Sequence, residues 1–211
     1  MIKKLTAIFA ALTIALCLCG CDYEDYPSAF SEQLYMIKKY NQYDFEVKYT
    51  DNDIIDKCFE EITAGPLVLS LPMNASDLPD DVTLEFDKYY EHTNSYNGFR
   101  TVLTDILIGE NDIGNATVLC KNDDDFNNGT IVALTIYSTY VNASAGDWSL
   151  DMTFDEIDTI MGFDGNGGNK YIYSSSDGKS VYFSNFYDGV EYPDAVCIST
   201  IPELCAYHLL Y

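Results

Sequence analysis

The chain has 211 residues, and its 34 Asp and Glu against 11 Lys and Arg give a formal net charge of −23 at pH 7. Its apolar content of 47% is enough to form a core, which excludes an intrinsically disordered chain. The acidic charge excludes a sequence-independent nucleic-acid surface, because such a surface needs clustered cations against phosphate. It also excludes electrostatic attraction to anionic lipid headgroups.

The first twenty residues have the layout of a secretory signal. Lys3 and Lys4 form a short basic start, and an uncharged run of 14 residues follows from Leu5 to Leu18. This run is too short to span a bilayer, since a spanning helix needs about 20 apolar residues. We expect residues 1–20 to be removed, which leaves a mature chain with a net charge of −25.

The end of this signal resembles a bacterial lipobox. Leu18, Cys19, Gly20 and Cys21 match its pattern of Leu, a small or medium residue, Gly or Ala, and Cys, although position 19 is usually Ser, Ala or Thr. The resemblance implies that Cys21 carries a diacylglycerol, with acyl chains such as palmitate, and holds the protein on the extracytoplasmic face of a bacterial cell membrane. Two chains at roughly 0.8 kcal/mol per buried methylene give stable anchoring. The alternative is an ordinary signal that leaves Cys21 as a plain thiol.

Four further cysteines remain in the mature chain, an even count that permits two disulfides in an exported protein. We favour Cys197 with Cys205, which are close in sequence, and Cys58 with Cys120. The alternative is four buried thiols. No pair has the CxxC spacing of a zinc or redox site, and the acidic loop at 123–129 lacks the Gly and Glu positions of an EF-hand. The sequence therefore predicts no metal and no cofactor.

Four helices are predicted along the chain. Apolar residues recur at helical spacing over residues 30–40 and 54–62, and the second stretch follows an acidic start at residues 51–53. Thr153 and Glu156 form a capping box before an apolar stripe that ends at Gly162. A C-terminal helix is expected over residues 202–210.

The signals between these helices are typical of β-strands. The ranges rich in alternating, β-branched or aromatic residues are 82–86, 99–108, 116–120, 130–137 and 195–199. A hairpin is predicted over 171–183 around Asp177 and Gly178. With these two as the loop, Ile172 would face Phe183, and Tyr173 would face Tyr182 on the opposite side of the sheet.

These elements predict an α+β fold of two layers, an antiparallel β-sheet with helices packed on one face. We expect a signal peptide over 1–20, a lipidated tether and N-terminal helix over 21–50, a first α+β unit over 51–145, and a second over 146–211. The second unit contains a helix followed by a three-stranded meander, and the first has a similar order of elements.

The second unit resembles a known module. Residues 151–157, the stop at Gly162 and the aromatic hairpin are similar to outer-membrane assembly lipoproteins and to β-lactamase-inhibitor-protein-like repeats. Asp151 stands where those modules have Gly, and residues 161–164 lack their Pro. The stretch 71–79 is similar to lipoproteins of gut Firmicutes. The resemblance implies a binding or scaffold module without enzymatic activity.

The sequence favours a binding or structural module over an enzyme. Tyrosine supplies large amphipathic contact area, and four tyrosines fall in the hairpin region. We take Tyr171, Tyr173, Tyr182 and Tyr187 as candidate binding residues for a protein or glycan of the cell envelope, the alternative being cross-strand pairs that only stabilise the sheet. A second hypothesis is a glycosidase-like envelope hydrolase that uses an acidic pair, because the distance between two carboxylates decides such chemistry.

The lipid anchor makes a direct prediction. Cys21→Ala removes the sulfur that carries the diacylglycerol, so we expect metabolic labelling with a fatty acid to be lost and the protein to move into the medium. Fractionation and immunoblotting measure both effects. Unchanged membrane retention of the variant would contradict the anchor.

Overall fold

The computed structural model describes residues 46–85, 94–96, 99–121, 123–139, 141–168, 171–185 and 190–201. The predicted signal, Cys21, the helix expected over 30–40 and the helix expected over 202–210 lie outside these residues. The described part contains two α-helices, α3 (Asn52–Glu60) and α4 (Phe154–Ile160), and two 3-10 helices, η1 (Ala75–Asp77) and η3 (Asp123–Asn128). All other regular elements in it are β-strands.

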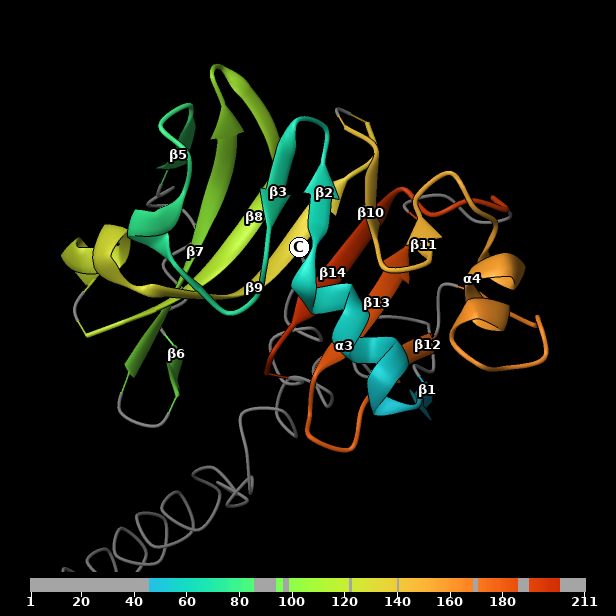
Figure 1. Ribbon diagram of the computed structural model, residues 1–211. Helices are drawn as coiled ribbons and strands as arrows, with labels where there is room; N and C mark the ends of the chain where they lie inside the picture. Colours follow the sequence, from blue (N-terminus) through green and yellow to red (C-terminus); the bar gives the residue numbers. More distant parts are fainter. Residues whose placement is uncertain are drawn as a thin grey trace, which may run out of the picture.

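One large sheet runs through the described part (Figure 1). Its strands lie in the order β1 (Glu46–Tyr49), β12 (Tyr171–Ser174), β13 (Ser180–Ser184), β14 (Ala195–Ser199), β9 (Thr130–Tyr137), β8 (Asn111–Cys120), β7 (Phe99–Ile108) and β5 (Val82–Glu85). Two short strands add to it: β4 (Met73–Asn74) pairs with β9, and β6 (Asn94–Tyr96) pairs with β7. The β1–β12 pair is parallel, and every other pair of this sheet is antiparallel.

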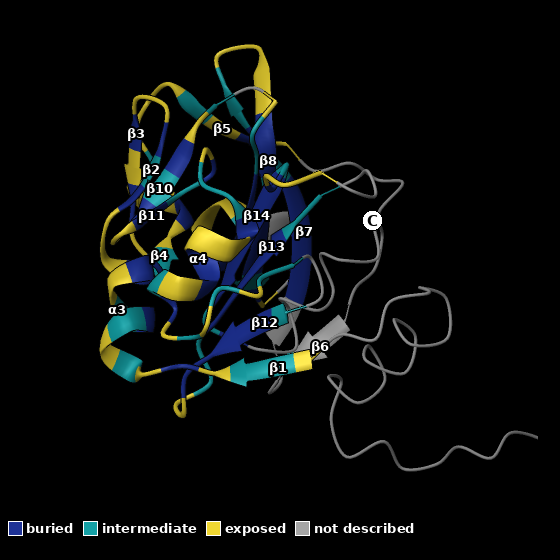
Figure 2. Ribbon diagram, turned by 90° about the vertical axis from the view of Figure 1, so that its right-hand side faces the viewer, coloured by how far each residue is buried: buried dark blue, intermediate teal, exposed yellow. Residues whose placement is uncertain are grey.

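A second, smaller sheet covers one face of the large one. It has the order β11 (Trp148–Ser149), β10 (Ala143–Ala145), β2 (Ile62–Ala64) and β3 (Leu67–Leu69). Figures 1 and 2 show this sheet, α3 and α4 together on the same side of the large sheet. Two tight turns make the small sheet possible, at Gly65–Pro66 and at Gly146–Asp147, and each begins with a glycine of positive φ.

The predicted α+β fold class is wrong, because β-sheet dominates the molecule and a second sheet occupies much of the layer expected to be helical. The strands of this second sheet are two or three residues long. An alternation of apolar and polar residues cannot be recognised over so few positions, whereas the two helices give clear signals of their own.

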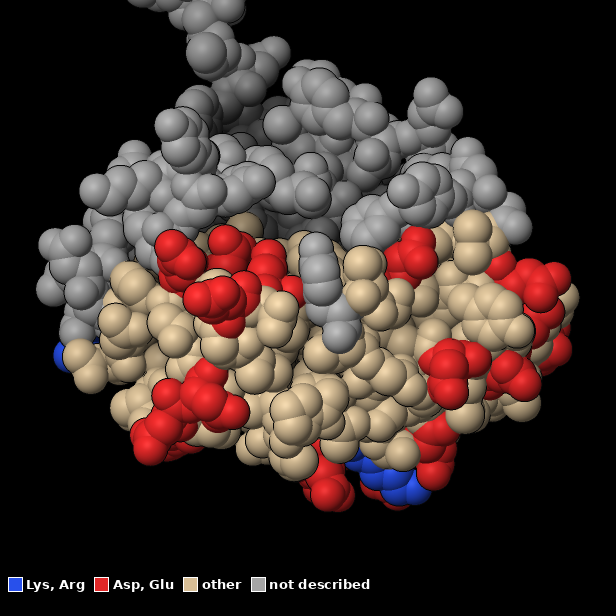
Figure 3. All heavy atoms as spheres, turned by 90° about the horizontal axis from the view of Figure 1, so that it is seen from above, with Lys and Arg blue, Asp and Glu red and all other residues tan. Residues whose placement is uncertain are grey.

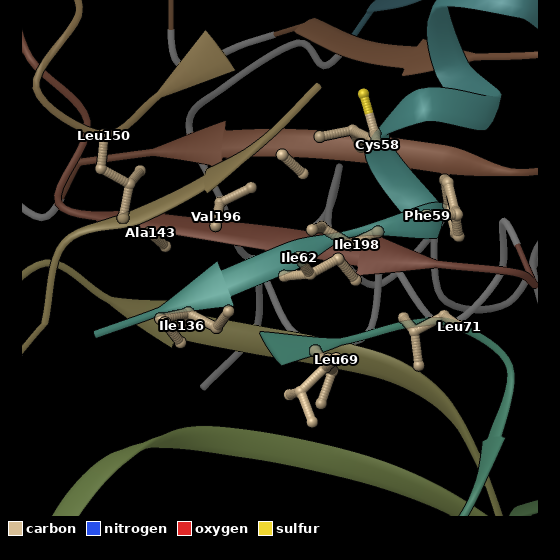
Figure 4. Close-up of a cluster of buried hydrophobic side chains, with 14 of the residues drawn as sticks. Cys58, Phe59, Ile62, Leu69, Leu71, Ile136, Ala143, Leu150, Val196 and Ile198 are labelled. Atoms are coloured by element: carbon tan, nitrogen blue, oxygen red, sulfur yellow. The ribbon is translucent and has the colours of Figure 1, made fainter. Parts of the chain in front are cut away.

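The core lies between the two sheets and under α3 (Figure 4). Buried residues of α3 and the small sheet, such as Phe59 and Ile62, pack against Val196 and Ile198 of the large sheet. Each residue of this size contributes roughly 1.5–3 kcal/mol when it is fully removed from water. Apolar burial between sheets therefore holds this fold together.

An aromatic chain crosses the same core. The rings of Trp148 and Phe183 lie 5.0 Å apart and edge to face, Phe183 contacts Tyr173 at 6.3 Å, and Tyr173 contacts Phe163 at 6.0 Å. Edge-to-face pairs contribute about 0.5–1.5 kcal/mol beyond area burial. These ring contacts connect Trp148 of the small sheet, by way of Phe183 and Tyr173 of the large sheet, to Phe163 in the loop after α4.

Both described helices begin where their sequences predict. The side chain of Asp51 caps α3 by accepting from the backbone N–H of Asp53. At α4 both halves of the predicted capping box are present, since Thr153 Oγ1 accepts from the N–H of Glu156 and Glu156 accepts from the N–H of Thr153. The strand predictions for 99–108, 130–137 and 195–199 are also confirmed.

The predicted register of the hairpin is wrong by one residue. Ile172 pairs with Tyr182, and Tyr173 pairs with Val181. The reason is the turn: the N–H of Ser175 donates to the carbonyl of Lys179, which leaves three loop residues with Gly178 at a positive φ. Tyr173 therefore lies on the core side of the sheet and Tyr182 on the other side, in separate apolar clusters.

The large sheet crosses the boundary expected between residues 145 and 146. β9 of the first expected unit pairs with β14 of the second over five residue pairs. β1, which belongs to the expected tether, pairs with β12. The ranges 51–145 and 146–211 therefore contribute strands to one common sheet.

A substitution at Gly114 tests how closely β8 approaches β9. A Cβ at this position would lie 1.9 Å from the carbonyl oxygen of Thr135, and the backbone has a φ of +148°. We expect Gly114→Ala to lower the free energy of unfolding in urea by at least about 2 kcal/mol. Gly168→Ala is the matched control, because a Cβ there meets nothing within 4 Å. Equal stability of the two variants would contradict the tight register.

Candidate functional site

The structure separates the candidate tyrosines. Tyr173 and Tyr182 are only 2% and 4% exposed and lie on opposite faces of the sheet. Tyr171 is half-buried, on the same face as Tyr173. Tyr187 lies outside the described residues. Tyr171 and Tyr173 thus belong to one site, whereas Tyr182 belongs to the packing of the other face.

That site surrounds the ammonium group of Lys48 on β1. Its Nζ lies 3.6 Å from the centre of the Tyr171 ring, 4.7 Å from that of Phe163 and 6.0 Å from that of Tyr173. It also donates to Oδ1 of Asp158 at 2.6 Å. We call these five residues the lysine cage. Aromatic rings and a carboxylate both favour a cation, so the cage is built for an ammonium group.

Asp158 of α4 is the buried partner of this cation. Its side chain is 0% exposed and that of Lys48 is 13% exposed. Two further donors reach the carboxylate: the hydroxyl of Tyr173 to Oδ1 at 2.9 Å and the backbone N–H of Asn166 to Oδ2 at 3.1 Å. A buried carboxylate needs such partners, since an unpaired charge in the interior costs several kcal/mol.

The environment of Tyr173 keeps its hydroxyl protonated. Burial and the hydrogen bond to Asp158 raise the pKa of Tyr173 far above its ordinary value, because both disfavour the phenolate. Tyr173 is therefore a permanent hydrogen-bond donor to this carboxylate at any physiological pH.

A glycine-containing loop after α4 completes the lysine cage. Gly167 approaches the backbone so closely that a Cβ would lie 1.9 Å from the carbonyl oxygen of Phe154, and its N–H donates to Oδ1 of Asp155. This approach positions the neighbouring N–H of Asn166 over Asp158. Sequence reasoning missed Lys48, Asp158 and Phe163. The available signal was the charge of Asp158 within an otherwise apolar stripe of α4.

Cys58 is a free buried thiol, so it forms no disulfide with Cys120. It donates to the carbonyl of Ile54 and accepts from Nε1 of Trp148 at 3.1 Å. Burial raises the pKa of Cys58 to about 11. Cys120 and Cys197 are also buried, on β8 and β14. Cys205, the predicted partner of Cys197, lies outside the described residues.

An open groove of about 530 Å³ lies beside β3. Its walls come from the end of α3, from β3, from the segment leading to β4 and η1, and from the start of β9. The residues that line it are Glu60, Val68, Leu69, Ser70, Pro72, Met73, Asn74, Asp77 and Thr130. We call it the β3 groove. It combines apolar side chains with two carboxylates, and its volume is within the range of ligand sites.

The strand beside this groove is an edge of the small sheet. β3 pairs with β2 on one side and has no partner strand on the other within the described chain. In a two-residue hairpin the pair next to the turn exchanges both hydrogen bonds, and the following pair, Thr63 and Val68, exchanges none. The N–H and C=O of Val68 therefore point away from β2. Val68 as a whole is 58% exposed.

Acidic side chains outnumber basic ones on the described surface that Figure 3 shows. In the view of Figure 3, acidic groups stand at several places and basic groups occupy small areas only. Three described lysines already have carboxylate partners: Lys48 with Asp158, Lys57 with Asp147 and Lys179 with Asp56. The surface therefore attracts cations. The described residues contain no cluster of three His, Cys, Asp or Glu that could hold a metal ion.

Comparisons with known proteins add no relative. No protein-family model matches the chain, and no curated protein or solved structure is significantly similar to it. Among the described helices none is long and apolar enough to cross a membrane.

The contribution of the Lys48–Asp158 pair to the stability of the fold can be measured. Lys48→Met removes the cation and leaves Asp158 buried without its ion pair, so we expect the free energy of unfolding to fall by about 3 kcal/mol. Urea unfolding followed by circular dichroism measures the change. The double variant Lys48→Met, Asp158→Leu should recover the part of the loss that comes from the unpaired charge, because neither charge then remains in the interior. A single variant as stable as the wild type would contradict the importance of the pair.

The thiol of Cys58 makes a second prediction. Because its pKa is about 11 in the folded protein, Cys58 should stay unmodified by iodoacetamide at pH 8 and become modified once urea unfolds the chain. Peptide mapping measures the modified fraction. The raised pKa also means that this thiol contributes stability that is present below pH 9 and is lost as the pH rises towards 11. Rapid modification of the native protein would contradict the burial.

Proposed function

We propose that this protein is a membrane-anchored, extracytoplasmic bacterial lipoprotein that binds a partner of the cell envelope through the β3 groove. The observation that carries the binding function is a strand edge without a partner strand in the described chain, beside a groove of about 530 Å³. Cys21 would supply the anchor. The protein then acts as an interaction module, which agrees with the binding role expected from its sequence.

The occupant that this groove favours is an extended peptide segment with basic side chains. An edge strand offers its N–H and C=O groups to a further strand, and such pairing supplies affinity through the main chain. Glu60 at the end of α3 and Asp77 in η1 line the groove and would contact alternate side chains of the added strand. Because the mature chain carries a charge of −25, a basic segment is also attracted from a distance.

A glycosidase-like hydrolase is the second candidate, because Glu60 and Asp77 line one groove. This chemistry needs both carboxylates, one to protonate the leaving oxygen and one to act as base or nucleophile. Release of reducing ends from purified cell-wall glycan by the wild type, and its loss in both Glu60→Gln and Asp77→Asn, would favour the hydrolase over the binding module.

Charge reversal in the groove tests the binding function. We expect a labelled peptide of alternating Lys and Val residues to bind the wild type, and Glu60→Lys with Asp77→Lys to weaken binding at least about tenfold through like-charge repulsion. Fluorescence anisotropy at two salt concentrations measures the affinity. Asp80→Lys with Asp81→Lys is the matched control, since it changes the net charge equally without altering the groove lining. Equal affinities of both double variants would leave only a nonspecific charge effect and contradict the site.

The strand edge has a test of its own. Val68→Pro removes the outward N–H, while the pairing of β3 with β2 does not use that group, so the fold should be retained. We expect peptide binding to be lost in this variant and kept in Val68→Thr, which preserves the N–H. Binding that survives the proline would contradict strand addition.

A further inference from the structure

The amine of Lys48 and the carboxyl group of Asp158 are the two groups that an amide bond forms from. Their side chains meet at 2.6 Å in the interior, although the residues are 110 positions apart in the sequence. The side chain of Asp158 is 0% exposed, and that of Lys48 is 13% exposed. This pair is more buried than the other ion pairs given for the described residues: Lys179 is 28% exposed and its partners Asp56 and Asp177 are 41% and 50% exposed, and Lys57 and Asp147 are 59% and 75% exposed.

We propose that Lys48 and Asp158 condense to an intramolecular isopeptide bond that covalently joins β1 to α4. The ammonium group of Lys48 first passes one proton to Oδ1 of Asp158 along their hydrogen bond. The amine lone pair then forms a bond to Cγ, and the bond between Cγ and Oδ1 breaks. Oδ1 leaves as water with the first proton and a second one from the attacking nitrogen, and a neutral secondary amide remains. The balance needs no oxidant, reductant or co-reactant.

The surroundings of Asp158 provide the two contacts that this reaction requires. The N–H of Asn166 donates to Oδ2, the oxygen that carries negative charge once Cγ becomes tetrahedral. The hydroxyl of Tyr173 donates to Oδ1, the oxygen that leaves. Both donors are in position before reaction, so no reorganisation is needed.

Burial also supplies a driving force. Two ions in the interior keep the cost of their lost hydration, whereas an amide carries no net charge. Both groups are held in contact by the fold, which gives an intramolecular reaction the effective concentration that a bimolecular one lacks. The rings of Tyr171 and Phe163 keep one side of the site apolar.

The product would fasten the first described strand to the rest of the domain. β1 is four residues long and lies at one end of the large sheet, where β12 is its only partner among the described strands. Four parallel pairings alone are weak. A covalent bond from Lys48 to α4 would hold this strand against pulling or partial unfolding.

Peptide mapping of the purified full chain tests the bond. Trypsin cleaves after free lysine and not after an acylated one, so we expect no cleavage after Lys48. A branched peptide should appear that joins the segments containing Lys48 and Asp158, with a mass one water molecule below their sum. Lys179, whose ammonium group also pairs with a carboxylate, is the internal control in the same digest, and cleavage after it should be complete. Complete cleavage after Lys48 with both linear peptides at full mass would overturn the proposal.

Three variants give independent tests of the bond, so the proposal can still be tested if one of them fails to fold. Asp158→Asn should form the same amide with loss of ammonia in place of water, a mass signature that no ion pair produces. Lys48→Arg keeps the cation and should abolish the branched peptide. Tyr173→Phe removes the donor to the leaving oxygen and should slow formation by about 100-fold, with the product accumulating over time. A branched peptide that persists in folded Lys48→Arg would contradict the assignment of the nitrogen.

Discussion

The charge on Asp158 constrains much of this structure. A carboxylate without exposed surface must have donors, and here they come from three separate segments: Lys48 of β1, Tyr173 of β12 and the backbone of Asn166 in the loop after α4. These contacts fix the entry of the chain into the large sheet, the rotation of α4 about its axis and the path of the glycine-containing loop. Apolar burial between the two sheets supplies most of the stability, but it does not by itself choose among alternative placements of an edge strand. The ion pair with the buried carboxylate of Asp158 favours the observed placement of β1.

Sequence patterns predicted the longer elements well. Thr130–Tyr137 and Ala195–Ser199 are recognisable because β-branched residues fill strands of eight and five residues, and Thr153 with Glu156 is a local motif whose partners lie three positions apart. The small sheet escaped prediction because Ile62–Ala64 and Leu67–Leu69 are too short for any period to develop. The hairpin register failed for a related reason: Asp177 and Gly178 suit a two-residue loop, whereas a bond between Ser175 and Lys179 selects a loop of three.

The site could be predicted only in part, because its members are distant in sequence. Tyr171 and Tyr173 were recognised as a concentration of aromatic residues, yet nothing local indicates that they enclose Lys48, more than 120 positions away. The β3 groove is equally non-local, since its walls run from Glu60 to Thr130. An anchored binding module, an open strand edge and a covalent clasp at β1 are mutually consistent proposals. Each would suit a domain that is held at one end and engages a partner elsewhere on its surface.

The position of Trp148 gives the molecule an internal optical reporter. It is the single tryptophan of the whole chain, and it is 1% exposed at the junction of the small sheet, α3 and the large sheet. Its ring packs edge to face with that of Phe183, and its indole N–H donates to the sulfur of Cys58. The wavelength of the tryptophan emission therefore depends on one location only. A red shift would signal water entering between the sheets, and the intensity would respond to the neighbouring sulfur. Separation of the two layers can thus be followed in real time without an added label.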